Sequence, residues 1–151
     1  MISDYMIVRG LKKGDFEPVI KLWLDFFIED TKDIVKSYLE KKYTRGEFLV
    51  AVEGGKIIGF IGFSKDVFYE SDYIESIVVN KKFRRSGVAQ LLIEEFEKQA
   101  IENGRRRVFS SVEPQNRIAV QMHKSLGYEE CGYVDHLWDE NKRDLFFTKK
   151  L

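Results

Sequence analysis

Residues 77–89 read Ile-Val-Val-Asn-Lys-Lys-Phe-Arg-Arg-Ser-Gly-Val-Ala, and this stretch says more about the fold than any other part of the chain. The β-branched run 77–79 predicts a buried strand, and the residues from Ala89 onward predict a helix. A basic loop with Gly87 near its end joins the two. The first N–H groups of a helix lack internal partners and the helix dipole is positive there, so this arrangement predicts an anion site.

The loop has the chemistry of a phosphate site. Gly87 has no Cβ, so the backbone can approach a ligand closely. Arg84 and Arg85 carry permanently charged forks that suit phosphate oxygens. The chain contains neither G-x-x-x-x-G-K-[ST] nor G-x-G-x-x-G with a following acidic residue, so the two common nucleotide loops are not indicated. For the loop alone, the alternative is a solvated basic turn before an ordinary amphipathic helix.

The pattern Arg84-x-x-Gly87-x-Ala89 resembles the acyl-CoA pyrophosphate loop of the GNAT superfamily of N-acetyltransferases, which reads [RQ]-x-x-G-x-[GA]. Residues 116–128 are similar to the family's later motif, N-x-x-A-x-x-x-Y-x-x-x-G-[FY], and residues 7–15 to its first strand and first helix cap. The three segments stand in the family's order and cover nearly the whole chain. The resemblance implies a transferase, an acyltransferase of the N-acetyltransferase type. The length fits a single domain over residues 1–151, and the lone cysteine and the lack of a signal-peptide pattern make a cytoplasmic location the expectation.

The resemblance implies acetyl-CoA as the cosubstrate. In this family the fourth and fifth strands splay apart below the loop and hold the pantetheine arm, whose amides can satisfy unpaired backbone groups. A backbone amide of Val78 or Val79 would also polarise the thioester carbonyl. The Asn116 amide would contact pantetheine or cap a helix. The residues expected to bind the cofactor are Ile77, Val78, Val79, Arg84, Arg85, Ser86, Gly87, Val88, Ala89 and Asn116.

Acetyl transfer to a primary amine needs a general base, because such an amine is mostly charged at neutral pH. Glu75 is the candidate, since it shares strand parity with Ile77 and could line the cleft. The alternative is a solvated carboxylate at a strand end. Asp72 and Glu70 are weaker candidates for the base.

The leaving thiolate needs a proton, and here the chain departs from the family pattern. His123 stands where the family usually has Tyr, two helical turns after Asn116. An imidazole with a pKa near 6.5 is mostly neutral at pH 7, so it would need a raised pKa or would act as an N–H donor. A histidine without a chemical role, with the thiolate leaving unaided, is the other possibility. Tyr128 and Tyr133 are expected in the core.

Composition sets broader limits. The chain has 151 residues with 25 Lys+Arg against 25 Asp+Glu, so it lacks the basic excess typical of a nucleic-acid partner. No apolar span suits a membrane, and the N-terminus does not look like a signal peptide. The one cysteine, Cys131, fits a reducing compartment and is expected to pack in the last sheet strands. Two separate histidines, His123 and His136, make a metal site a poor expectation.

The hydrophobic pattern predicts an α+β fold with a mixed, mostly antiparallel sheet flanked by helices, the fold that the resemblance also implies. Gly54-Gly55 between two apolar runs predicts a tight hairpin. The expected elements are strand 5–9, a helix beginning near Asp15, helix 32–42, strands 48–52 and 56–63, loop 65–71, strand 72–80, a helix ending near Gly104, strand 107–112, helix 114–126, and strands 128–138 and 143–149.

Two functions fit these observations. The first is an acetyl-CoA-dependent N-acetyltransferase acting by direct attack in a ternary complex, on a small molecule, a peptide N-terminus or a lysine. The second is a non-catalytic acetyl-CoA sensor or interaction module, which the His123 exchange keeps open. Asp66, Glu70 and Asp72 could attract a cationic acceptor or form a solvated acidic loop. The family often forms homodimers through its last strands, so a homodimer is a possible state.

Overall fold

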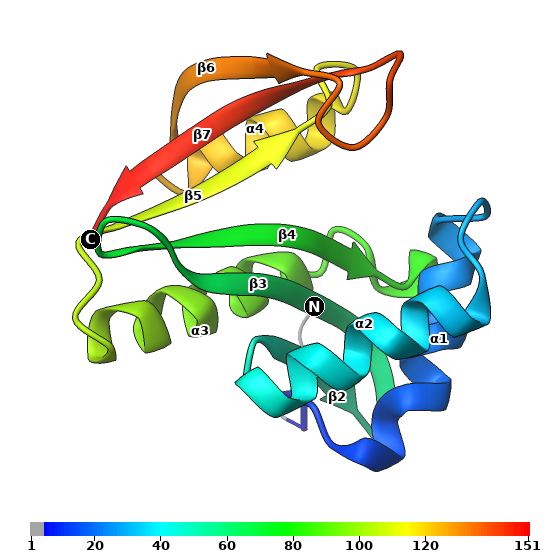
Figure 1. Ribbon diagram of the computed structural model, residues 1–151. Helices are drawn as coiled ribbons and strands as arrows, with labels where there is room; N and C mark the ends of the chain where they lie inside the picture. Colours follow the sequence, from blue (N-terminus) through cyan, green and yellow to red (C-terminus); the bar gives the residue numbers. More distant parts are fainter. Residues whose placement is uncertain (1–4) are drawn as a thin grey trace. The chain divides into compact units, whose positions relative to one another are not determined.

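The chain forms one mixed sheet with helices packed on it (Figure 1). The computed structural model describes residues 5–151. The strand order is β1-β2-β3-β4-β5-β7-β6, with β4 and β5 parallel, so the predicted α+β class is confirmed. The elements are β1 (Ile7–Gly10), the 3-10 turn η1 (Lys13–Asp15), α1 (Phe16–Phe26), α2 (Lys32–Arg45), β2 (Phe48–Glu53), β3 (Lys56–Phe68), β4 (Ser71–Val79), the 3-10 turn η2 (Lys81–Phe83), α3 (Val88–Glu102), β5 (Arg107–Val112), α4 (Arg117–Ser125), β6 (Glu129–Asp135) and β7 (Arg143–Lys150).

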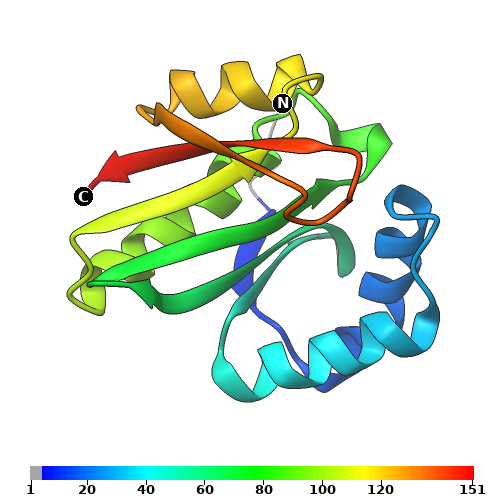
Figure 2. The same ribbon diagram turned by 45° about the horizontal axis from the view of Figure 1, so that its top comes forward.

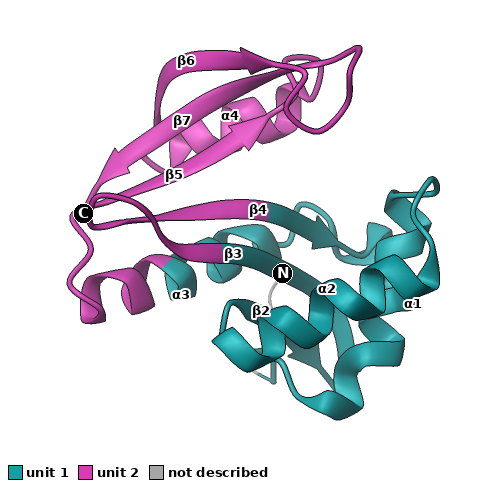
Figure 3. Ribbon diagram, viewed as in Figure 1, with its two compact units in different colours: residues 1–63, 76–96 teal, residues 64–75, 97–151 magenta. Residues whose placement is uncertain are grey.

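The residues divide into two compact units, coloured separately in Figure 3. Unit 1 comprises the chain up to Phe63 together with Ser76–Phe96. Unit 2 comprises Ser64–Glu75 and Glu97–Leu151. A single domain over the whole chain stays a prediction.

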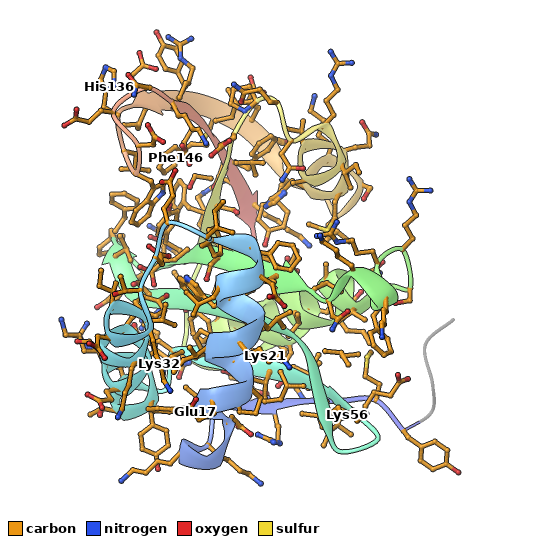
Figure 4. The ribbon with its side chains drawn as sticks, turned by 90° about the vertical axis from the view of Figure 1, so that its right-hand side faces the viewer. Glu17, Lys21, Lys32, Lys56, His136 and Phe146 are labelled. Atoms are coloured by element: carbon orange, nitrogen blue, oxygen red, sulfur yellow. The ribbon has the colours of Figure 1, made fainter. Side chains whose placement is uncertain are left out.

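The core of unit 1 lies between α1, α2 and the strands β2 and β3. Trp23 of α1 stacks on Phe60 of β3, with ring centroids 5.4 Å apart and planes 3° from parallel. Thr31 caps α2 by accepting a hydrogen bond from the Ile34 N–H. Glu17 and Lys32, labelled in Figure 4, form an ion pair of 3.1 Å between the first turns of the two helices. The buried core residues are Leu11, Val19, Ile20, Leu22, Val35, Leu39, Phe48, Val50, Val52, Phe60 and Val78.

The hairpin predicted at Gly54-Gly55 joins β2 to β3, where φ is 55° and 76° at the two glycines. The loop predicted at 65–71 is wrong, because β3 continues as a strand to Phe68. The polar residues Lys65 and Asp66 predicted a loop, but both belong to the strand, in which Asp66 is exposed and adopts a positive φ of 56°. The actual turn is Tyr69–Glu70, and Glu70 adopts a positive φ of 47°.

Unit 2 is built on β5, β7 and β6. Figures 1 and 2 show α4 lying along one face of these strands, where Val108, Tyr128 and Phe147 are buried. Tyr128 is therefore in the interior as predicted. The same expectation for Tyr133 is wrong, because it lies on β6, an edge strand whose residues are all exposed. Cys131 lies in the last pair of strands as expected, but its side chain is exposed on β6.

The acidic residues near the β3–β4 turn are paired with arginines. Asp72 is buried and accepts a hydrogen bond of 2.8 Å from the Arg105 Nε. Arg105 also lies 3.8 Å from Asp66, and Arg106 pairs with Glu70 at 2.6 Å. These ion pairs offset the charge that could have attracted a cationic acceptor. Among the described helices, none is long and apolar enough to cross a membrane.

Candidate functional site

The loop between β4 and α3 has the backbone of an anion site. Gly87 adopts a φ of 85°. Its carbonyl accepts a hydrogen bond from the Leu91 N–H at 3.1 Å, so Gly87 is the N-cap residue of α3. Arg85 also lies in the left-handed region, with a φ of 63°. Left-handed residues in a turn direct successive N–H groups toward one side, a concave arrangement that binds anions. The α3 N-terminus supplies further N–H donors at the same place.

The side chains of the loop are placed differently from one another. Arg84 and Arg85 are both exposed, so their guanidinium groups are accessible to a ligand. The Arg84 guanidinium lies 4.8 Å from the centre of the Phe26 ring of α1, a cation–π contact. The Ser86 hydroxyl donates a hydrogen bond to the Phe83 carbonyl, which holds the loop rather than capping α3.

Gly59 on β3 fixes the position of this loop, and the sequence alone did not identify it. A Cβ at Gly59 would lie 3.0 Å from the Val78 carbonyl oxygen and 3.2 Å from the Val88 Cγ1. Both distances are shorter than most Cβ contacts, so a side chain here would press against the end of β4 and the start of α3, and glycine permits the close approach of β3. The signal was an isolated glycine inside a strand pattern, which often marks a close backbone approach.

The strand and helix residues that flank the loop anchor it in unit 1. Val78 is part of the unit 1 core, and Val88 at the α3 start is buried. Ile77, Val79 and Ala89 are half-buried. These residues therefore hold the loop on a packed support. Their predicted contacts with the cofactor stay a prediction.

The positive φ of Arg85 leads to a prediction on stability. A non-glycine residue in the left-handed region costs about 1–2 kcal/mol relative to the right-handed region. We therefore expect Arg85→Gly to be more stable than Arg85→Ala by about 1 kcal/mol, because only glycine adopts this φ without strain. Chemical denaturation of both variants measures the difference. Equal stabilities would show that the backbone at Arg85 is unstrained.

Within unit 2, a set of polar residues lies where β4 and β5 part. Their register pairs Ser71–Ile74 with Arg107–Ser110 and stops before Glu75. Glu75 is half-buried, and its negative charge contributes to raising the pKa of the nearby Tyr73. The Tyr73 hydroxyl lies 2.6 Å from the Ser111 Oγ, and Ser111 in turn bonds to Asp144. The sequence did not point to this network, because its members come from three separate strands.

His123 is buried and both of its ring nitrogens have partners. Nδ1 lies 2.7 Å from the Ala119 carbonyl oxygen, so it carries the proton and donates. Nε2, 2.8 Å from the Ser110 Oγ, is then the acceptor. The ring also packs against Tyr128 and Phe147. Burial lowers the pKa of His123, against the opposing effect of the Ala119 bond, so the imidazole is neutral at pH 7.

These bonds bear on the predicted role of His123 as the acid. A neutral imidazole that donates to Ala119 and accepts from Ser110 has no free N–H. Donation to a thiolate would require one of these bonds to break. The role therefore stays a prediction. It would cost the free energy of breaking a hydrogen bond of the buried His123 ring.

Asn116 caps α4, since its Oδ1 accepts the Ala119 N–H at 3.2 Å. The capping alternative is thus present, while a contact with pantetheine stays a prediction. Arg117 and Lys124 are exposed on α4. Over residues 5–151, no group of three or more His, Cys, Asp or Glu side chains is arranged to hold a metal ion.

The mixed sheet with its parallel β4–β5 pair, and the loop at the start of α3, define an acyltransferase with the GNAT fold. The chain belongs to the Acetyltransferase (GNAT) family, whose sequence model matches residues 16–128. An acetyltransferase of Photorhabdus laumondii subsp. laumondii is 30% identical over 153 residues, which span 97% of this chain and 96% of that protein.

Solved structures share the fold. The crystal structure of an N-acetyltransferase from Staphylococcus aureus Mu50 aligns with a TM-score of 0.83 at 20% identity, over 96% of this chain and 98% of that one. The structure of yncA from Salmonella typhimurium, with its cofactor acetyl-CoA, aligns with a TM-score of 0.80 at 19% identity, over 98% of this chain and 95% of that one.

Proposed function

We propose that this protein is an acetyl-CoA-dependent N-acetyltransferase that acts on a primary amine in a ternary complex. The observation that carries the proposal is the loop at 84–89, where Gly87 with a φ of 85° opens α3. The family membership and the acetyl-CoA held by the fold neighbour from Salmonella typhimurium support acetyl-CoA as the cosubstrate.

In this proposal the pyrophosphate of acetyl-CoA binds the first-turn N–H groups of α3. These donors are fixed by the helix, and hydrogen bonds from N–H groups to an ionised oxygen are among the stronger ones. The exposed guanidinium groups of Arg84 and Arg85 add charge beside them. The pantetheine arm then extends along the Val78–Val79 end of β4, where a backbone N–H polarises the thioester carbonyl.

Two protons must leave the acceptor nitrogen during the reaction. The ammonium form loses the first before it can attack, and the adduct loses the second as the amide forms. The nitrogen bonds to the carbonyl carbon, and the carbon–sulfur bond breaks with its electron pair on the CoA thiolate. We assign the first proton to Glu75, which is half-buried at the point where β4 and β5 part.

The test has two measurements on the purified protein. Calorimetry measures acetyl-CoA binding, and a coupled thiol assay measures turnover with spermidine, Nα-acetyl-lysine amide and a peptide with a free N-terminal alanine. We expect saturable binding and turnover with at least one amine. Binding without turnover for all three would favour the sensor function. The hydrogen bonds that occupy both ring nitrogens of His123 are compatible with that function. Absence of binding would remove both functions.

A further inference from the structure

A cavity of about 460 Å³ lies at one end of unit 2. The β3–β4 turn, the start of β5 and the end of β7 come together there (Figure 1). Its volume falls within the range of about 300–1,000 Å³ that is usual for small-molecule sites. The polar and aromatic lining includes Phe68, Tyr69, Ser71, Arg107, Phe109 and Lys150, which all belong to unit 2. The cavity therefore has the size and the chemistry of a ligand site.

Three polar side chains of the lining stand in one row across the sheet. Ser71 of β4 pairs in register with Arg107 of β5, and Arg107 pairs with Lys150 of β7. Residues directly opposite each other on neighbouring strands point to the same face of a sheet. The hydroxyl, the guanidinium and the ammonium therefore share one face. Ser110 points to the other face of β5, where it meets His123 of α4, so the row lies on the face away from α4.

The Ser71 hydroxyl in this row is buried without a partner. The residue is 1% exposed, and its Oγ forms no hydrogen bond with any of residues 5–151. Most buried polar groups in proteins are paired, because leaving one unpaired costs free energy. An unpaired hydroxyl on the wall of a cavity indicates that a ligand supplies the missing partner.

The two cations of the row are available for an anion. The two arginines that precede Arg107 in the sequence are already paired, with Asp72 at 2.8 Å and with Glu70 at 2.6 Å. Within the part of the chain that the structure describes, neither Arg107 nor Lys150 forms an ion pair with a carboxylate. The row therefore offers two positive charges and three hydrogen-bond donors beside one another.

Aromatic rings form the wall next to the row. Phe109 stands two residues after Arg107 and so points to the same face of β5. The Phe68 ring packs edge-on against Phe109, with centroids 5.2 Å apart and planes 71° apart. Tyr69 is 76% exposed, and the Arg106 guanidinium lies 4.9 Å from the centre of its ring. Exposed rings beside a cavity suit a ligand that carries a flat ring, because such a ring can stack on them.

We propose that this cavity binds a nucleoside monophosphate, with the phosphate on the row of Ser71, Arg107 and Lys150 and the base on the aromatic wall. A phosphate monoester carries about −1.5 to −2 charges at pH 7 and has three acceptor oxygens. Two cations match this charge, and three donors match the oxygens. A carboxylate, with one charge and two oxygens, would leave one donor unused. The site does not depend on the proposed acetyl transfer, which assigns no role to these residues.

Calorimetric titration of the purified protein with AMP tests the site, first with AMP alone and then with acetyl-CoA in excess. Acetyl-CoA also contains a nucleotide, so its excess keeps AMP away from the loop at 84–89. We expect one AMP to bind per chain, with the same affinity in both titrations. Absence of AMP binding, or its loss when acetyl-CoA is added, would overturn the proposal. AMP binding by a protein that does not bind acetyl-CoA would support this site and remove the proposed acetyl transfer.

Two variants test the phosphate row. Lys150→Met removes one cation at an exposed position, and Lys124→Met, an exposed lysine on α4, is the matched control. We expect AMP affinity to fall roughly tenfold in Lys150→Met and to stay within about twofold in Lys124→Met. Ser71→Ala should also weaken AMP binding roughly tenfold, yet be at least as stable to urea as the wild type, because its hydroxyl has no protein partner to lose. Wild-type AMP affinity in both Lys150→Met and Ser71→Ala would overturn the row as the phosphate site.

A third variant separates the base from the phosphate. Tyr69→Ser removes an exposed ring and leaves the row in place, so AMP affinity should fall roughly tenfold while the affinity for inorganic phosphate stays unchanged. In the wild type, AMP should bind more tightly than inorganic phosphate, because only AMP has a ring to stack. Equal affinities for AMP and inorganic phosphate would show an anion site without a base, and would overturn the nucleotide assignment.

Discussion

A Gly87→Asp variant should keep its fold and bind acetyl-CoA about 100-fold more weakly than the wild type. Gly87 has a φ of 85°, and Asp is one of the residues that tolerate this region best. The new carboxylate would occupy the α3 N-terminus, where the N–H groups otherwise meet the pyrophosphate. Losing one or two charge-assisted hydrogen bonds, at about 1.5–3 kcal/mol each, accounts for the effect. Calorimetric titration with acetyl-CoA measures it.

Two control variants separate charge from backbone strain. Gly87→Asn has nearly the same shape and φ preference as Gly87→Asp but no charge, so we expect less than about a tenfold loss of affinity. Gly104→Asp places the same residue at a φ of 76° with no atom within 4 Å of its Cβ, just beyond the other end of α3. That variant should bind as the wild type does. Wild-type affinity in Gly87→Asp would exclude the loop as the pyrophosphate site.

The loop could be predicted from sequence because its parts are contiguous. A β-branched strand, a turn glycine and a helix start follow one another within residues 77–89. Each has a local physical cause, and the positive φ of Gly87 is the conformation that glycine permits. The hairpin at Gly54-Gly55 was predictable for the same reason.

The network of Tyr73, Ser111 and Asp144 could not be found in this way. Tyr73 and Ser111 are 38 positions apart in the sequence. The three residues meet only because β4, β5 and β7 are neighbours in the sheet. Tyr and Ser in strands are ordinary residues when they are read singly. Likewise, the sequence suggested that Asp72 belongs to an acidic loop, but its side chain is buried and accepts a hydrogen bond from Arg105. Ion pairing between distant segments leaves no local pattern.

His123 lies between these cases. Its position two helical turns after Asn116 could be predicted from the sequence spacing, and both residues belong to the α4 segment. Its hydrogen-bond partner Ser110 lies on β5, and this contact could not be predicted from the sequence. A motif position therefore identifies which helix carries the side chain, while the hydrogen-bond partners decide whether its proton is available.

A His123→Phe variant should lose about 1–3 kcal/mol of its free energy of unfolding, because Ser110 would be left buried without its acceptor. Phe keeps much of the ring packing against Tyr128 and Phe147. A second substitution, Ser110→Ala, should recover most of the loss, since removing both partners is nearly neutral. Urea denaturation of the single and double variants measures this cycle.

The pH dependence of stability gives an independent check. The folded-state pKa of His123 is lowered, so the unfolded chain binds the proton more readily. The stabilisation is therefore complete above about pH 6.5, the unfolded value, and is lost as the pH falls toward the folded pKa. His123→Phe should remove this part of the pH dependence. His136→Phe is the control, because His136 is exposed (Figure 4) and its replacement leaves the buried His123 and its hydrogen bonds in place.

The same variants decide whether His123 also acts as the acid. If the ring is structural, kcat in Ser110→Ala/His123→Phe should return toward the wild-type value together with stability. If the ring donates a proton to the thiolate, kcat should stay low in the double variant, because restoring the packing does not restore the proton. The two roles make opposite predictions for one protein that is folded in either case, so stability and turnover measured side by side distinguish them.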